Sequence, residues 1–395
     1  MLSKIKSLRT NENILIAIDA LFHAKHFFFS IFLMTFMIRS SLNDSPVEYI
    51  VYLIFTYIIM ATLAVALVFF IKKHILTAWR IGIFMSMAQV LAIIFFHSAP
   101  FFIHILAILS GVQAALYWRP QTFLMITEVS NARRFRFESI KHTVSSIVKI
   151  IIPVVLALFI TEIGYIEVSI LVFVAASFQF FASILLRPVN NITTKTQKLY
   201  LIMCRLKRNK LAFKNILLLQ ALRGFAVGST ALIAPAVILY NETNSDLNMG
   251  FYTSLSAAIF IIIIPIYNKL RSTKCFSIAR ASLILLPALI LPLLAMLWSS
   301  LVVIIIFFLF MRVIVDLLMN MVIIIKIKNS IRDLVSNDYI LEAESISEVA
   351  LNIGRIAALT ALLVLISLTG LAYLPIFIAV CSLAIIPILK FTKST

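Results

Sequence analysis

The chain has 395 residues, of which 62% are apolar and only 13% are charged. Soluble domains carry roughly 25% charged residues because their surfaces face water, so this composition excludes a soluble globular protein. The net charge of +18 is compatible with a nucleic-acid partner, but the basic residues lie in short connections between apolar segments, as in membrane proteins. We therefore expect contact with the lipid bilayer and no nucleic-acid partner.

The first apolar segment, at 14–38, follows a basic N-terminus and resembles a signal peptide in that respect. It contains Asp19, His23, Lys25 and His26 and has no small-residue cleavage site, so we interpret it as a retained helix. A membrane-spanning helix needs roughly 20 apolar residues. Eleven further segments of this kind follow, at 48–71, 80–97, 100–127, 140–161, 166–186, 214–240, 248–268, 278–298, 300–325, 345–368 and 372–389.

Basic residues are concentrated in the N-terminal tail and after every second apolar segment. The alternate connections hold Arg39 as their one basic residue, together with several acids. Because cytoplasmic loops of membrane proteins are enriched in Lys and Arg, this alternation predicts that both termini are cytoplasmic. It also predicts a multi-pass protein of the cell (plasma) membrane.

The longest polar connection divides the chain into two halves. We predict a six-helix bundle at 1–186, a basic cytoplasmic linker at 187–213 and a second six-helix bundle at 214–395. Glu138-Ser139-Ile140 and Glu344-Ser345-Ile346 open the fifth and eleventh helices, and the same offset aligns Lys149 with Arg355. The match indicates a parallel repeat of six-helix halves, although an Ile-rich chain can produce one by chance. The expected fold class is an all-α integral membrane protein of twelve helices in two pseudo-symmetric bundles.

Charged residues also occur within the apolar segments. A charge at the bilayer centre costs roughly 2.5 kcal/mol or more, so these side chains must face one another or a watery cavity. The interior acids are Asp19, Asp316 and Glu348, with Glu128 at a helix end. The interior cations outnumber them: they are Lys25, Arg119, Lys149, Arg223, Arg312 and Arg355. This surplus favours a substrate that bears a carboxylate or phosphate.

Size, topology, the division into six and six helices and the placement of the charges make the chain similar to the major facilitator superfamily. The resemblance implies that helices 1, 4, 7 and 10 line a central cavity and that helices 3, 6, 9 and 12 pack outside. The family's Gly…Asp-Arg…Gly-Arg pattern between helices 2 and 3 is reduced here to basic charge at Lys72, Lys73 and Arg80. The glycine-rich helix-5 pattern of many antiporters is also absent around Pro153.

Asp19, His23 and His26 lie at i, i+4 and i+7, which places them on one face of the first helix. A carboxylate beside a histidine can pass protons, since histidine titrates near neutral pH. Alternatively, Asp19 only neutralises Lys25 or Arg223. A metal site would need further ligands, and we expect none. Asp316 and Glu348 complete the candidate proton-coupling set. Alternatively, each acid only forms an internal salt bridge, Asp316 with Arg312 and Glu348 with Arg355.

Polar residues of helix 4 form a second candidate surface. One face of this helix carries Gln113, Tyr117 and Gln121, whereas Arg119 points elsewhere. The shared face is suited either to bind substrate or to pack against another helix, and the sequence leaves both interpretations open. In helix 7, Arg223 lies beside Gly224, a residue that permits close helix contact. The predicted substrate-binding or cavity residues are Gln113, Tyr117, Arg119, Lys149, Arg223, Arg312 and Arg355.

The function predicted from these features is secondary active transport of a small anionic or amphipathic solute, coupled to protons by alternating access. Multidrug or peptide efflux within the same superfamily is the first alternative. A membrane-embedded lipid-handling enzyme and a non-transporting sensor or immunity protein are others. We expect a monomer with no catalytic residue, cofactor or metal, whose partners are a small-molecule substrate, protons and the bilayer.

Overall fold

The protein was analysed as a computed structural model that describes residues 10–40, 46–128, 131–186, 210–227, 245–271, 331, 340–370 and 373–383. All regular elements in these residues are helices. Two compact units divide the chain: the first comprises Met1–Thr194 and Asp246–Ser254, and the second comprises Lys195–Ser245 and Leu255–Thr395. Each unit is described by itself.

Unit 1 begins with α2 (Thr10–Phe27), the π-helical turn η1 (Phe28–Phe32) and α3 (Leu33–Ser40). Together these elements form the first predicted helix. The π turn accommodates one extra residue per turn, a local departure that is frequent at functional sites in helices. It lies between the charged inner part of this helix and Arg39 near its end.

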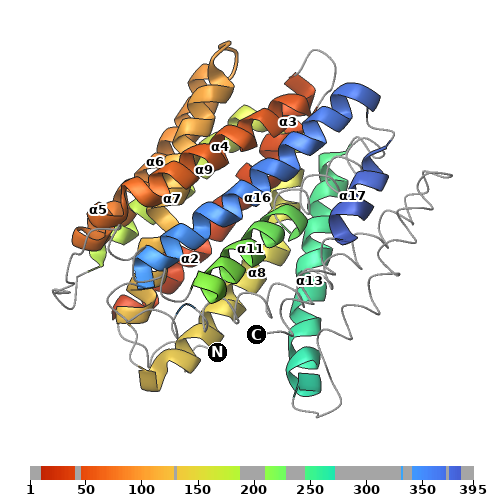
Figure 1. The fold of residues 1–395 in the computed structure, drawn as a ribbon. Coiled ribbons are helices and arrows are strands. Elements are labelled where there is room, and N and C mark those ends of the chain that lie inside the picture. The colour runs from red at the N-terminus through yellow and green to blue at the C-terminus, as the bar shows by residue number, and fades with distance from the viewer. Residues whose placement is uncertain are drawn as a thin grey trace. The chain divides into compact units, whose positions relative to one another are not determined.

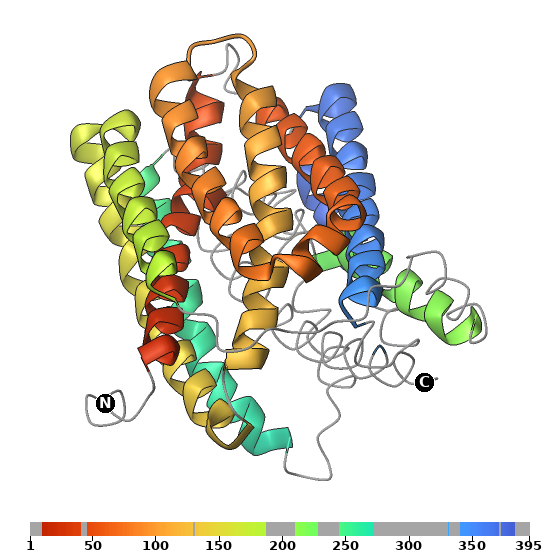
Figure 2. The same ribbon diagram turned by 90° about the vertical axis from the view of Figure 1, so that its left-hand side faces the viewer.

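The remaining helices of unit 1 follow the predicted order. They are α4 (Val47–Ala66), α5 (Val68–Lys73), α6 (Ile75–Phe96), α7 (Phe102–Glu128), α8 (Asn131–Ile163) and α9 (Tyr165–Leu185). The first turns of α13 (Asp246–Arg271) also belong to this unit. Figure 2 shows the red α2 beside the yellow α8 and the yellow-green α9, with which it packs.

Unit 2 contains α11 (Lys210–Val227), the rest of α13, α16 (Ile340–Thr369) and α17 (Leu374–Leu383). Here α11 packs along α16 (Figure 1). A methyl group on Gly224 would lie 2.0 Å from the Leu351 carbonyl oxygen, and one on Gly354 would lie 2.0 Å from that of Ala221. The two helices therefore meet backbone to backbone, and the close helix contact expected at Gly224 is confirmed.

Several helices start earlier than predicted. The expected loop before residue 80 is mostly helical, so Arg80 lies within α6, and α11 starts at Lys210 rather than at 214. The prediction that Glu138 and Glu344 open their helices is wrong, because α8 starts at Asn131 and α16 at Ile340. Hydropathy detects only the part of a helix that is apolar, whereas its own backbone hydrogen bonds extend it into polar sequence.

Seven of the described helices are long and apolar enough to cross a membrane. They correspond to predicted helices 1 to 6 and 11. Predicted helices 9 and 10, at 278–298 and 300–325, lie outside the described residues, as does the predicted linker up to residue 209. The chain is thus a multi-pass membrane protein whose described elements are all helical, and the total of twelve spans stays a prediction.

Arg80 shows what replaces the expected family motif between helices 2 and 3. Its guanidinium donates hydrogen bonds of 3.2 to 3.3 Å to the carbonyl oxygens of Ser183, Ile184 and Leu186. Ser183 and Ile184 belong to the last turn of α9, where carbonyl oxygens lack partners within the helix, and Leu186 is the residue that follows its end. A cation at a helix C-terminus also complements the helix dipole, so this basic residue joins α6 to α9 inside unit 1.

Candidate functional site

Asp19 lies in the interior of unit 1, where its side chain is held by groups from two other helices and from α2 itself. Gln121 Nε2 of α7 donates to Asp19 Oδ1 at 2.9 Å, and Ser145 Oγ of α8 donates to Oδ2 at 2.7 Å. His23 Nε2 lies 3.7 Å from Oδ2, one helical turn along α2. The residue is only 5% exposed. The three polar neighbours compensate for the cost of burying this carboxylate, a cost that an isolated carboxylate would bear in full.

Tyr117 and Gln179 extend this polar network. Gln179 Nε2 of α9 donates to the Ile18 carbonyl oxygen at 3.1 Å and contacts the Tyr117 hydroxyl at 3.4 Å. Both residues are fully buried. Helix α9 therefore contributes a polar group to the site, although the family resemblance implied that this helix only packs outside.

Three buried polar atoms around Tyr117 have no hydrogen-bond partner in the part of the chain that the structure describes. They are Gln121 Oε1, Gln179 Oε1 and Trp79 Nε1. Each of the two amides donates through its nitrogen, Gln121 to Asp19 and Gln179 to the Ile18 carbonyl oxygen, so each amide oxygen is left as an acceptor. Buried polar groups of this kind are ordinarily paired or hydrated, so these three atoms can each form a further hydrogen bond.

Basic groups surround the same part of α2. Lys25 is buried and donates to the Ser86 hydroxyl of α6. The expectation that Asp19 serves as the counter-ion of Lys25 thus loses its geometric basis, since the Lys25 ammonium binds a hydroxyl. Lys149 of α8 is half-buried and interacts electrostatically with Asp19, and His26 is exposed and interacts with both lysines.

Two of the three residues predicted to share a face of helix 4 lie in one polar network, and their role in binding substrate stays a prediction. Tyr117 and Gln121 both belong to the Asp19 network, and Gln113 is half-buried on the same helix. Arg119 points elsewhere, as expected: its Nη1 donates to the Ala64 carbonyl oxygen of α4 at 2.6 Å. That bond ties the C-terminal turn of α4 to α7 and identifies Arg119 as a helix-capping residue in this conformation.

Unit 2 has its own polar cluster between α11 and α16. Gln220 Nε2 donates to Ser347 Oγ at 2.7 Å, and Arg223 Nη1 donates to Gln220 Oε1 at 3.2 Å. Arg355 Nη1 donates to Asn352 Oδ1 at 3.0 Å and lies 3.9 Å from Glu348 Oε1. The salt bridge expected between Glu348 and Arg355 is present at long range, and the charges of Arg223 and Glu348 also interact. Arg312 and Asp316 lie outside the described residues.

A third cluster was not predicted. Arg39 Nη2 lies 2.9 Å from Asp246 Oδ2, and the Tyr165 hydroxyl donates to Asp246 Oδ1 at 2.5 Å. The Arg39 guanidinium also lies over the Tyr165 ring, 5.7 Å from its centroid. The sequence did contain a signal for this cluster: Arg39 is the one basic residue in the connections predicted to lie outside the cytoplasm. Ser145 and Gln179 were also missed, because lone uncharged polar residues in apolar helices do not stand out.

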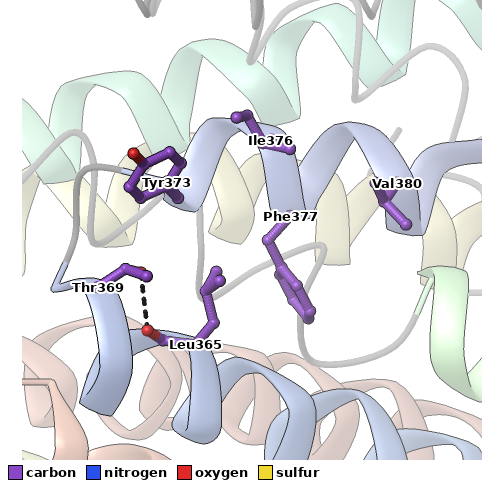
Figure 3. A pocket seen from close by; sticks show the side chains of 6 residues that line it. All are labelled: Leu365, Thr369, Tyr373, Ile376, Phe377 and Val380. Atoms are coloured by element: carbon purple, nitrogen blue, oxygen red, sulfur yellow. Dashed lines mark hydrogen bonds between the residues drawn. The ribbon is translucent and has the colours of Figure 1, made fainter.

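Among the described residues, no group of three or more His, Cys, Asp and Glu side chains is arranged to hold a metal ion. A cavity lies in unit 2, between the end of α16 and the start of α17 (Figure 3). It has a volume of about 300 Å³ and is lined by Leu365, Thr369, Tyr373, Ile376, Phe377 and Val380. Its lining is apolar apart from two hydroxyl groups, so it offers no site for a charged solute.

No family model matches the chain, and no curated protein matches it. Solved structures match over nearly its whole length. The POT family transporter PepTSo has a TM-score of 0.71 and 10% identity, with 98% of both chains covered. A POT family transporter in complex with a thioalcohol-conjugated peptide has a TM-score of 0.70 and 12% identity, with 99% of both chains covered.

A bacterial homologue of the iron transporter ferroportin, in an outward-facing state, also matches. Its TM-score is 0.61 at 16% identity, with 98% of this chain and 100% of that chain covered. The chain has the fold of these transporters. Identities of 10% to 16% show a shared fold and carry no information on the substrate.

Proposed function

We propose that the protein is a secondary transporter that carries a small anionic solute across the cytoplasmic membrane, with a proton as the coupling ion at Asp19. The observation that carries this proposal is a buried carboxylate bound to Gln121, Ser145 and His23 in a membrane-spanning helix bundle. Ionisable residues inside membrane proteins are costly and commonly belong to ion or proton pathways. The transporter fold of the chain supports transport rather than catalysis.

The geometry offers a way to couple protonation to helix packing. The ionised Asp19 carboxylate accepts hydrogen bonds from α7 and α8 at the same time. Protonation removes the charge that strengthens both bonds, so it weakens the connection of α2 to each neighbour. His23 is near enough to exchange a proton with Asp19 through a small side-chain rotation or one water molecule.

The basic groups of the two units support an anionic substrate. In unit 1 the half-buried Lys149 interacts electrostatically with Asp19. In unit 2 the charges of Arg223 and Arg355 both act on Glu348. Guanidinium groups bind carboxylates and phosphates through paired hydrogen bonds. We assign Lys149 in unit 1 and Arg355 in unit 2, which the sequence repeat aligns, as the cations that favour an anionic solute.

The test is proton movement in proteoliposomes that contain a pH-sensitive dye. A set of small carboxylates and phosphate esters is added one at a time, and the internal pH is recorded. We expect at least one anion to acidify or alkalinise the lumen through the wild-type protein and not through Asp19→Asn. Glu162→Gln, which changes an exposed carboxylate on α8, is the matched control. Proton movement by Asp19→Asn equal to that of the wild type contradicts coupling at this residue.

Peptide transport is the second candidate, favoured by the match to POT family transporters. A dipeptide carries an ammonium group as well as a carboxylate, so it would need both an acidic and a basic partner. In the same liposome assay, proton movement driven by dipeptides and not by simple carboxylates would favour this candidate.

The finer architecture belongs to the same proposal. We assign the chain to the major facilitator superfamily, with twelve helices, cytoplasmic termini, a division at the linker 187–213 and function as a monomer in the plasma membrane. The fold match supports this assignment, and the basic alternate connections support the orientation.

A further inference from the structure

Three rings lie nearly parallel in unit 1, in a series that runs from the interior to an exposed position. The Tyr117 and Phe22 centroids are 4.2 Å apart with an 11° angle between the rings. Phe22 and His26 are 5.3 Å apart with an angle of 16°. Tyr117 and Phe22 are buried, whereas His26 is exposed. The series therefore ends in an imidazole ring that is accessible from outside the packed interior.

Trp118 of α7 flanks the same series. Its ring meets Phe22 edge to face at 4.8 Å and an angle of 75°, and the side chain is 40% exposed. A large indole that is held from one side and accessible on another, next to an exposed imidazole, is suited to bind a planar ring by stacking and edge contact.

Cationic charge lies beside the exposed end of the series. Lys149 lies one turn of α8 beyond Ser145, whose hydroxyl donates to Asp19 of α2, and the charges of Lys25 and Lys149 both act on His26. Lys25 is buried and bound to Ser86, so Lys149, which is half-buried, is the cation that a ligand can reach. An aromatic surface next to an accessible ammonium group is complementary to a ring that bears a negative substituent.

We propose that His26, Trp118 and Lys149 form a subsite for a ring-bearing anion, in which the planar ring stacks on His26 beside the edge of Trp118 and the anionic group binds the Lys149 ammonium. The inference rests on the proposed function in one respect, namely that the solute is an anion. It adds that the solute is aromatic or heteroaromatic.

Benzoate and cyclohexanecarboxylate are suitable probes, since they share a charge and a carbon count and differ in the planarity of the ring. Binding of each to the purified wild-type protein is measured by the rise in melting temperature over a concentration series. We expect benzoate to bind about 3-fold to 10-fold more tightly, the range that a favourable aromatic contact provides. Lys149→Gln should weaken both acids.

Variants separate stacking from a general effect on the fold. His26→Leu and Trp118→Leu should abolish the preference for benzoate and leave cyclohexanecarboxylate binding nearly unchanged, whereas His26→Phe should retain the preference. Phe178→Leu removes a 63% exposed ring of α9 outside the series and should behave as wild type.

Equal binding of the two acids by the wild type, or no binding of either, overturns the aromatic subsite. Lys149-dependent transport of aliphatic anions without preference for aromatic ones also overturns it, while the proposed function stands. Absence of proton movement with every anion in the liposome assay instead contradicts the proposed function itself.

Discussion

The Ser145 hydroxyl of α8 donates a 2.7 Å hydrogen bond to Asp19 Oδ2 of α2, which links residues 126 positions apart in the chain. This bond joins the candidate coupling carboxylate to the helix that carries Lys149. If Asp19 is the coupling residue, as proposed, a change in its charge alters this bond to α8, and Ser145 is the residue to test.

Replacement of Ser145 should uncouple transport without unfolding the protein. Ser145→Ala removes one donor to a buried carboxylate, a loss worth about 1–3 kcal/mol. We expect reduced solute accumulation at a fixed pH gradient in vesicles, with solute exchange retained. Ser145→Thr keeps the hydroxyl and should keep most of the activity. The neighbouring half-buried Ser146→Ala is the control, and an equal effect of both alanine variants would contradict the assignment.

Replacement of Asp19 should separate binding from coupling. Asp19→Asn keeps the size of the side chain but carries no proton, so gradient-driven accumulation or efflux should be lost while substrate exchange continues. Asp19→Glu should retain part of the activity. The measurement is uptake in sealed vesicles with an imposed pH gradient. Full gradient-driven transport by Asp19→Asn would reduce this residue to a structural role.

Charge removal at the repeat-related cations should weaken anion transport. Lys149→Gln and Arg355→Gln each remove a positive charge at matching positions of the two halves. We expect a higher substrate concentration for half-maximal transport in both, with normal membrane insertion and a normal melting temperature. Unchanged transport kinetics in both variants would refute the assignment of these two cations to anion transport.

The contact between α11 and α16 should not tolerate side chains at its two glycines. Gly224→Ala and Gly354→Ala would each place a methyl group 2.0 Å from a backbone carbonyl oxygen of the other helix. Because neither backbone can move aside freely, we expect a loss of about 1–3 kcal/mol, seen as a lower melting temperature in detergent. Ala357→Val adds carbon atoms at an exposed position of α16 and should have little effect.

Orientation can be tested by cysteine labelling with an impermeant reagent on intact cells. Asp246 is unsuitable as a reporter of the outer side because it is buried against Arg39 and Tyr165. Glu162 is exposed at the end of α8 and is the better position. In a background without native cysteines, Glu162→Cys should be labelled from outside and Lys210→Cys should not. Labelling of position 210 would reverse the predicted topology.

The sequence by itself determined the class of protein and the approximate position of its helices. Hydropathy and the positive-inside pattern are local properties of a chain, because each segment is matched to the bilayer on its own. The i, i+4 relation of Asp19 to His23 is equally local, and their side chains do lie 3.7 Å apart. The direction of Arg119 away from Tyr117 and Gln121 follows from helical periodicity in the same way.

Only the tertiary structure decided which groups meet across helices. Ser145, Gln179 and Ser86 are uncharged residues in apolar segments, and their roles as partners of Asp19, Ile18 and Lys25 depend on helix packing that no local pattern encodes. The same holds for the pair formed by Arg39 and Asp246. In the membrane interior a buried polar group must find a partner, so the sequence shows that partners are required and the fold selects them.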